Sequence, residues 1–599
     1  MSSSSTPAAP SVVERVSTFV SEHRRAVLFT AAVAAAAIGA AYYASSSSTA
    51  AARGDERRKD RKKDKKKRKA AKDEGGPVLE EVEPKAADGP DAELELTSEV
   101  IAAMSVEERA KVAASLKSKG NAAYPQKQYA KAAAYYTKAI DVTPKPEPVY
   151  FSNRAACYAN MQPPQNEHVV EDCDEALRLD PRYVKALNRR ATALEALGRF
   201  EDSLRDFTAS TILEKFANEQ TAASVERVLK KLATKKAEEI LATREPRLPS
   251  HTFVSAYFGA FRPRPLPQLP ENPSQGDNTL ILALEALAAQ DYPHSVTFVN
   301  EAIEQGISWD AGKAEALNLR GTFRFLMSDV KGAKEDLLES VKLVPGLTQS
   351  WVKLASVYME QGDPEKTFDC FEEAIKQNKN DPDIFYHRGQ VLFIMNQFQR
   401  AADDYTKSTE LDNQFVFSHI QLAVAQYKSE NLAQSMVTFR KTLREFPKRS
   451  EPYNYYGELL LDQGRFQDAV EKFEEAIRLE HEKNPPINAL PIVNKGLALY
   501  QWKQDIKAAE DCCHEALQID AECEAAVATL AQLYLQQNRI ADAVNMFKRQ
   551  AELARSEPEL VNALTYQFAS AAQIQFVESY PDMAPQLNQI AQAIAAGQQ

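Results

Sequence analysis

The chain has 599 residues, which is enough for several domains or for one long repeat array. Its formal net charge of −11 excludes a general nucleic-acid binder, whose binding domain would be basic, and its 20 glycines among alanine-rich stretches favour an all-α protein. Six irregularly spaced cysteines are too few for a disulfide framework, so we expect reduced thiols in a reducing compartment.

A membrane anchor is predicted close to the N-terminus, after a short segment at residues 1–25. Residues 26–44 carry no charge, and nineteen helical residues span about 29 Å, which is roughly the hydrocarbon thickness of a bilayer. Residues 53–69 hold twelve cations against four acids, so the positive-inside rule places the large C-terminal part in the cytosol. The alternative is a cleaved secretory signal, and the basic flank argues against it.

The composition of the anchor favours one membrane. Ten of its nineteen residues are alanine, so the segment is short and only modestly apolar. Such an anchor with basic flanks is more typical of the mitochondrial outer membrane than of the thicker plasma membrane. We therefore expect a single-pass protein of the mitochondrial outer membrane.

Residues 45–109 are predicted to be a disordered spacer. The first part is basic, and residues 73–99 are acidic and interrupted by proline. A segment of this composition cannot bury enough apolar surface to fold. The spacer would hold the folded part away from the membrane.

Further along, a small residue recurs at a fixed interval of 34 residues. The positions are Gly321, Ala355, Gly389, Ala423 and Gly457. Twelve residues after most of these positions lies a second small residue, and four residues after that lies a bulky residue. This is the tetratricopeptide pattern, in which small residues let two helices approach and bulky ones are expected to fill the gap between neighbouring hairpins. About eleven such units would stack into a right-handed superhelix with a concave groove.

The repeats divide into two arrays. A three-repeat domain is predicted at 110–215, followed by a capping helix and Pro-rich linker at 216–276 and a C-terminal array at 277–599 that ends in a capping helix. Seven prolines between residues 244 and 273 predict an extended or irregular connection, because proline removes helical hydrogen bonds.

Five polar side chains recur on the expected groove face of the three-repeat domain, and the steps from Asn121 to Asn153 and from Asn153 to Lys185 are each 32 residues. They are Lys117, Asn121, Asn153, Lys185 and Arg189. Arginine presents a planar fork, lysine a point charge and asparagine an uncharged donor, all of which suit carboxylates. The set predicts a clamp for the two carboxylates at a free C-terminus, although a solvated polar face would explain any one member.

The groove of the C-terminal array has a different chemistry at the same offsets. The predicted precursor-binding residues are Tyr386, Gln390, Phe417, Ile420, Val424, Asn454, Glu458, Val493, Asn494 and Leu497. Asp383, His387, Gln421, Glu451, Tyr455 and Leu490 share these offsets. A mixed apolar and acidic groove would suit an apolar segment with a few positive charges. The alternative for each residue is packing against a neighbouring helix.

Signs of catalysis are absent from the sequence. It contains no Gly-rich phosphate loop, HExxH pair or nucleophile elbow. Cys512, Cys513, His514 and Cys523 match no zinc spacing. We expect no enzyme, cofactor or metal site.

The order Lys-x3-Asn, Asn, Lys-x3-Arg on three consecutive repeats resembles the two-carboxylate clamp of co-chaperones. Such clamps hold the terminal Glu-Glu-Val-Asp of the cytosolic 70- and 90-kilodalton heat-shock chaperones. With the anchor, the second array and the string RLPSHTFVSAYFGAF, the chain from about residue 26 to its end is similar to the 70-kilodalton import receptors of the mitochondrial outer-membrane translocase.

The resemblance implies a receptor that docks these chaperones and receives their precursors, especially multi-spanning carriers with internal signals. The C-terminal array would bind the precursors before their transfer to other translocase subunits. An alternative is a soluble co-chaperone scaffold that bridges two chaperones, with residues 26–44 as a buried helix or processed leader. A co-chaperone with a linked enzyme is disfavoured because no non-repeat domain remains unassigned.

Overall fold

The computed structural model describes residues 93–483 and 487–585, and every regular element within them is helical. These residues form two compact units. Unit 1 comprises Ile240–Leu533 and Met546–Leu560, and unit 2 comprises 93–239, Tyr534–Asn545 and 561–585. In the described ranges, no helix combines the length and the apolar character needed to cross a bilayer. The anchor predicted at 26–44 lies outside those ranges.

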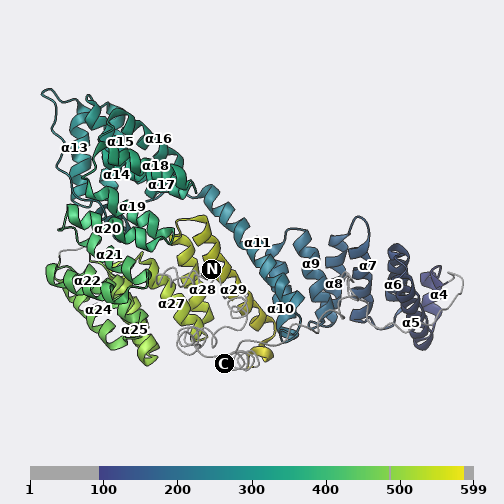
Figure 1. The fold of residues 1–599 in the computed structure, drawn as a ribbon. Coiled ribbons are helices and arrows are strands. Elements are labelled where there is room, and N and C mark those ends of the chain that lie inside the picture. Colours follow the sequence, from purple (N-terminus) through teal and green to yellow (C-terminus); the bar gives the residue numbers. More distant parts are fainter. Residues whose placement is uncertain (1–92, 484–486, 586–599) are drawn as a thin grey trace, which may run out of the picture. The chain divides into compact units, whose positions relative to one another are not determined.

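Unit 2 begins with a short helix and three antiparallel hairpins in series (Figure 1). The helices are α4 (Ser98–Ala103), α5 (Val106–Ala123), α6 (Tyr129–Val142), α7 (Pro148–Asn160), α8 (Asn166–Leu179), α9 (Val184–Ala196), α10 (Phe200–Leu213) and α11 (Glu219–Thr243). Helix α5 starts at a capping box in which Ser105 and Glu108 each bond the backbone of the other. The predicted capping helix corresponds to α11, whose Val228 and Leu232 are buried in one cluster with Leu204 and Phe207 of α10.

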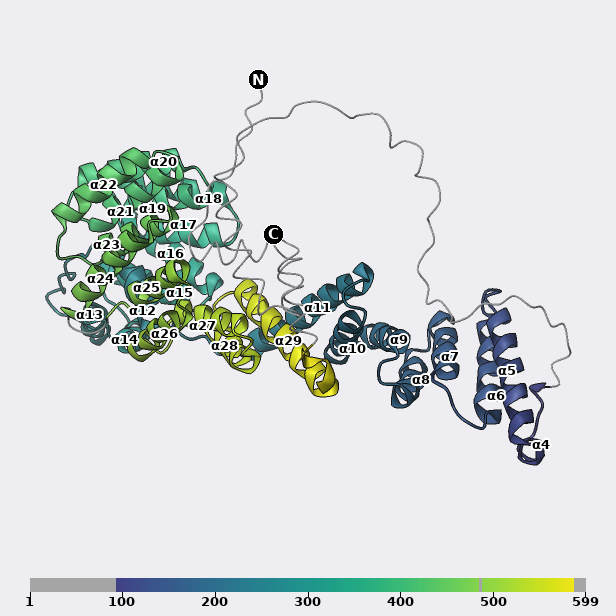
Figure 2. The ribbon, with the colours of Figure 1, turned by 90° about the horizontal axis from the view of Figure 1, so that it is seen from below.

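Unit 1 contains most of the second array, which Figure 2 shows winding into a superhelix from α13 to α26. Its helices and those that follow are α12 (His251–Gly259), α13 (Gln275–Ala288), α14 (Tyr292–Gln305), α15 (Asp310–Leu326), α16 (Val330–Leu343), α17 (Thr348–Glu360), α18 (Pro364–Gln377), α19 (Pro382–Ile394), α20 (Phe398–Leu411), α21 (Val416–Lys428), α22 (Leu432–Glu445), α23 (Glu451–Asp462), α24 (Phe466–His481), α25 (Leu490–Lys503), α26 (Ile506–Ile519), α27 (Glu524–Gln536), α28 (Ile540–Leu553) and α29 (Glu557–Ser579). Consecutive pairs give three hairpins in α5–α10 and eight in α13–α28. The described residues thus hold the eleven units expected from the 34-residue period.

The small residues of the period lie where two helices of one hairpin approach most closely. A Cβ built on Gly389 would lie 2.8 Å from the Tyr405 ring, and one on Gly457 would lie 2.6 Å from Phe473. The bulky residue therefore covers the small residue of its own hairpin first. It also reaches the next hairpin, as expected from the sequence: the rings of Phe439 and Tyr456 are 5.2 Å apart.

A closer approach occurs at the start of α13. A Cβ on Gly276 would meet the carbonyl oxygens of Gly306 and of Ala302, the latter at 2.6 Å, and backbone atoms cannot turn aside. We predict that Gly276→Ala destabilises unit 1 by about 1–3 kcal/mol through overpacking. Gly346→Ala is the matched control, because a Cβ there meets nothing within 4 Å. Urea unfolding followed by circular dichroism measures both, and equal midpoints would contradict the prediction.

A recurrent buried ion pair locks the two helices of several hairpins. The arginine directly precedes the small residue on the first helix, and the aspartate lies on the second: Arg154–Asp172, Arg190–Asp206, Arg320–Asp336 and Arg388–Asp404. In the Arg388–Asp404 pair, Arg388 Nε donates to Asp404 Oδ2 and Arg388 Nη2 donates to Asp404 Oδ1, both at 2.8 Å. A bidentate pair of this kind adds geometric specificity as well as energy, so it sets the register within the hairpin.

The Pro-rich linker is partly helical, which corrects the prediction of an irregular connection. Residues His251–Gly259 form α12, because no proline lies between Pro249 and Pro263. The Ser250 hydroxyl accepts from Phe253 N at 3.3 Å and starts the helix. Residues 260–273 are irregular, as predicted.

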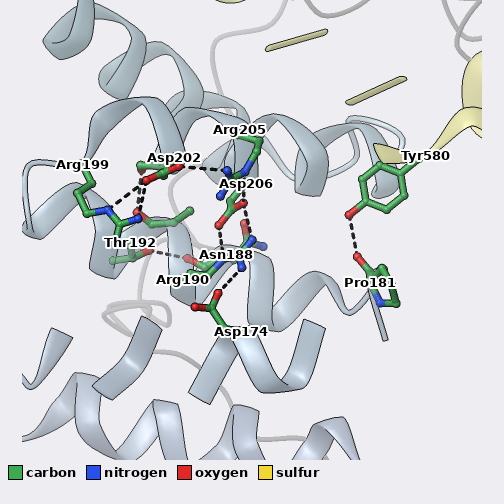
Figure 3. Close-up of polar contacts among 12 residues, drawn as sticks. Asp174, Pro181, Asn188, Arg190, Thr192, Arg199, Asp202, Arg205, Asp206 and Tyr580 are labelled. Carbon is green, nitrogen blue, oxygen red and sulfur yellow. Dashed lines mark hydrogen bonds and ion pairs between the residues drawn. The ribbon is translucent and has the colours of Figure 1, made fainter. Parts of the chain in front are cut away.

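Helix α29, the last α-helix in the part of the chain that the structure describes, contributes to unit 2. Helix α29 was expected to close the C-terminal array, whereas its residues from Val561 onward belong to the unit that holds the three-repeat domain. Phe576, Tyr580 and Met583 join a buried cluster with Phe151 of α7. Tyr580 Oη also donates to the carbonyl of Pro181 at 2.7 Å (Figure 3). The apolar face of this segment therefore completes a core that begins more than 400 residues earlier.

Candidate functional site

All five residues of the predicted clamp lie on the first helices of the three hairpins in unit 2. Lys117 and Asn121 are on α5, Asn153 is on α7, and Lys185 and Arg189 are on α9. Helix α7 contacts both α6 and α9. Because residues four apart share one face of a helix, α5 and α9 each present a pair of polar side chains on one face.

The two asparagines of the clamp are held in one hydrogen-bond network. Tyr136 Oη donates to Asn121 Oδ1 at 2.7 Å, and Asn153 Nδ2 donates to the same oxygen at 3.4 Å. Gly120 leaves room for the Tyr136 ring, because a Cβ there would lie 2.8 Å from Cζ. Burial raises the pKa of Tyr136 far above its ordinary value, so the hydroxyl stays a donor at neutral pH. Two donors on one carbonyl oxygen fix the orientation of the Asn121 amide.

Asn153, one of the predicted clamp residues, has an unpaired acceptor. Its side chain is fully buried, and Oδ1 finds no hydrogen-bond partner in the described part of the chain. A buried polar atom without a partner costs about 1–3 kcal/mol. A buried unpaired atom in a native fold calls for an explanation, and this one lies among the predicted clamp residues.

The two adjacent arginines of α9 serve different faces. Arg189 is buried, and its Nη1 donates to the carbonyl of Ser152 on α7 at 3.0 Å and also to the Ser152 hydroxyl. Arg190 instead turns toward α8 and α10, where it pairs with Asp174 and with Asp206 (Figure 3). Arg190 is thus neutralised within the fold, while Arg189 donates to uncharged oxygens beside Asn153.

The two lysines complete the positive charge of this face. Lys117 is half-buried, and its Nζ lies 5.8 Å from the centroid of the Tyr150 ring on α7. Lys185 is also half-buried, one turn before Arg189. Three cations and two amides on neighbouring helices form a surface suited to charge-assisted hydrogen bonds with carboxylates.

The predicted precursor-binding residues of the C-terminal array fall into different environments. Ile420 and Val493 are fully buried in the core, so packing explains them without a ligand. Tyr386 is also buried, and its Oη accepts from Gln390 Nε2 at 3.1 Å. Phe417, Val424 and Leu497 are half-buried.

The remaining three predicted residues form one polar cluster. Asn454 Nδ2 and Asn494 Nδ2 donate to Glu458 Oε1 at 2.8 and 2.9 Å. Asn494 also bonds Asn454 Oδ1 at 3.0 Å. The cluster joins α23 to α25, and Glu458 is its acidic member.

Unit 1 contains a second polar site, around Arg262 of the Pro-rich linker, that was not predicted from the sequence. Arg262 pairs with Asp383 at the start of α19. It also pairs with Asp412 at the end of α20, where Arg262 Nε lies 2.5 Å from Asp412 Oδ2. Its guanidinium also lies 4.1 Å from the centroid of the Phe415 ring. The preceding Phe261 stacks on His387 with ring centroids 4.1 Å apart.

A buried lysine completes this site. Lys353 Nζ donates to Asn318 Oδ1 at 2.6 Å and lies 5.0 Å from the Phe261 ring centroid. Burial lowers the pKa of Lys353 to about 7. Lys353 precedes the small residue Ala355 by two positions, as Arg189 precedes Ala191, so the repeat spacing could have identified it.

Comparison with known proteins agrees with the fold. The models described as tetratricopeptide repeat match residues 117–146, 348–381, 382–415, 420–483 and 503–565. The chain is 31% identical over 491 residues to the human mitochondrial import receptor subunit TOM70, covering 78% of this chain and 80% of that protein. It is 29% identical over 506 residues to TOM70 of Saccharomyces cerevisiae, covering 78% and 81%. The crystal structure of yeast Tom70 matches 80% of this chain and 99% of its own with a TM-score of 0.51 and 31% identity.

Proposed function

The chain belongs to the TOM70 family of mitochondrial import receptor subunits, and on this basis we propose that it is an import receptor of the mitochondrial outer membrane. Unit 2 docks the cytosolic 70- and 90-kilodalton heat-shock chaperones through their terminal Glu-Glu-Val-Asp. The C-terminal array receives the precursors that these chaperones carry, above all multi-spanning carriers with internal signals. Transfer to other subunits of the translocase follows, and residues 26–44 anchor the chain.

The observation that carries the proposal is the arrangement around Asn153. The C-terminal residue of a peptide offers a carboxylate and an amide N–H, both attached to its Cα. Lys117, Lys185 and Arg189 supply cations for carboxylates, and the unpaired amide oxygen of Asn153 lies on α7, between their helices in the chain. Cations on two helices, α5 and α9, can hold two carboxylates at once. A peptide that ends in an acidic residue presents two carboxylates on one residue, which favours a peptide C-terminus over an inorganic anion.

The expected affinity follows from the number of such contacts. Each charge-assisted hydrogen bond contributes about 1.5–3 kcal/mol before the costs of desolvation and ordering are subtracted. A few of them with one apolar contact give about −8 kcal/mol, or a dissociation constant of roughly 1 μM.

Calorimetry with the full chain tests chaperone docking. A peptide ending in Glu-Glu-Val-Asp should bind with a free C-terminus and fail to bind when that C-terminus is amidated. Equal binding of the two forms would exclude the carboxylate clamp.

The soluble scaffold remains the second candidate, favoured only by the clamp itself. Alkaline carbonate extraction of mitochondria separates the two functions, because a scaffold is released and an anchored receptor stays with the membrane. A reporter fused to residues 1–72 should mark the mitochondrial rim, and an endoplasmic-reticulum pattern would contradict the localisation.

A further inference from the structure

We propose that Phe261 and Arg262 are a resident peptide ligand of the C-terminal array, and that the site they occupy binds precursor segments in which an aromatic residue directly precedes arginine. We call this site the Phe-Arg seat, formed by Lys353, Asp383, His387, Asp412 and Phe415. The inference rests on the proposed role of the array as precursor receiver, and it names the chemistry of the segment received.

The seat recognises the arginine through charge and through its plane. Asp383 and Asp412 come from two helices and bind opposite parts of the guanidinium, at Nη1 and Nε. The Phe415 ring lies against the guanidinium, with its centroid 4.1 Å from Arg262 Cζ. Lysine has no planar group to stack and no second donor in a fixed direction, so these contacts select arginine.

The seat also recognises backbone and the aromatic residue. Arg262 N donates to Asp383 Oδ2 at 3.2 Å, and Gln349 Nε2 donates to the Arg262 carbonyl at 3.5 Å. Contacts to both backbone groups are those expected for a bound extended peptide. The Phe261 ring stacks on His387, and its centroid lies 5.0 Å from Lys353 Nζ.

The occupying segment contains no helix, and its departure would open a buried cluster around Phe261 and break the Arg264–Glu315 ion pair. Residues 260–273 have no regular structure, and Pro263 and Pro265 have no backbone N–H to lose. Upstream, α12 stays anchored through the buried Val254. A segment tethered this closely acts at an effective concentration on the order of 1 mM, so the unaltered chain should exclude a free peptide of similar affinity.

A peptide of the chain's own linker tests the seat. The probe is residues 255–266 (SAYFGAFRPRPL), labelled at its N-terminus, amidated at its C-terminus and titrated into the full chain by fluorescence anisotropy. We expect Phe261→Ala/Arg262→Ala, which vacates the seat, to bind the probe at least about tenfold more tightly than the unaltered chain. Adding Asp383→Asn and Asp412→Asn to that variant should remove the gain.

Two further measurements keep the outcomes distinct. If the double variant loses its helical circular dichroism, Arg262→Gln, which retains Phe261, replaces it and should give a gain in the same direction. Equal probe affinity of vacated and unaltered chains, or a gain that survives loss of both aspartates, overturns the inference. If the probe binds as expected but neither variant nor unaltered chain binds a carrier precursor, the proposed function fails and the seat stands.

The seat also predicts a pH dependence. The charged and titratable groups that act on Lys353 are Arg264, Glu315, Asp383 and His387. With the peptide seated, burial lowers the pKa of Lys353 to about 7, and vacating the seat is expected to raise that pKa toward its ordinary value. Undocking therefore takes up a proton above about pH 7, so docking is expected to strengthen as pH rises above that value.

Lys353→Met checks this sign, because methionine keeps most of the volume without a proton. The vacated chain should bind the probe more tightly at pH 9 than at pH 7, and the same chain with Lys353→Met should lose most of that difference. His387, whose pKa burial lowers to about 3, adds proton uptake of the same sign only below about pH 6.5. An unchanged pH dependence in the methionine variant overturns the assignment of Lys353 to the seat.

Discussion

Replacing Arg189 by alanine is expected to weaken binding of a Glu-Glu-Val-Asp peptide by at least about tenfold. Arg189 is the buried cation of the clamp, and a hydrogen bond to a charged group contributes about 1.5–3 kcal/mol. Isothermal calorimetry on the full chain measures the loss. Arg178→Ala is the matched control, because Arg178 lies on the neighbouring α8 and pairs with Glu175 at the surface.

Arg189 also fills space between α7 and α9, so its loss could act through packing. Arg189→Met keeps most of the volume and removes only the charge and the donors. If the methionine variant binds the peptide like the unaltered chain, the effect of the alanine variant comes from packing and the carboxylate clamp is wrong.

Asp336→Ala is expected to lower the free energy of unfolding of unit 1 by about 3 kcal/mol. Asp336 is buried on α16 and accepts from Arg320 at 2.6 and 2.8 Å and from Arg324 at 2.9 Å. Removing one partner of a buried ion pair costs about 3–5 kcal/mol, because the other charge stays uncompensated. Partial exposure of both arginines places the expectation at the lower end.

Urea unfolding of the full chain measures this loss, and a surface pair on the same helix provides the control. Glu339 bonds Lys342 at 3.1 Å, with both side chains in solvent, so Glu339→Ala should change little. Arg320→Ala combined with Asp336→Ala should recover part of the loss. Equal effects of Asp336→Ala and Glu339→Ala would show that the buried pair does not stabilise the hairpin.

Features encoded by local spacing were predictable from sequence. A glycine and an aromatic residue sixteen positions apart meet within one hairpin, so a fixed period identifies the fold. The same period placed the clamp residues on the first helices of three successive hairpins. It could not separate groove from core, because Ile420 occupies a groove offset and is nevertheless buried by its neighbours.

Contacts between distant parts of the chain left no signal in the sequence. Arg262 meets Asp383 and Asp412 across 121 and 150 residues. The composition of the Pro-rich linker does not predict that Arg262 pairs with these two aspartates. The docking of Tyr580 beside Pro181 spans 399 residues and is equally invisible to a 34-residue period.

The position of the last helix has a consequence for the order of events during synthesis. Phe576, Tyr580 and Met583 complete the cluster that Phe151 and Ala186 begin, so unit 2 lacks part of its core until residue 583 has been synthesised. At about 5–20 residues per second, the interval between Phe216 and Met583 is roughly 20–70 s. A nascent chain therefore exposes this apolar surface throughout that time. Under the proposed function, the nascent chain would bind the same chaperones as a folding substrate before it could dock them as a receptor.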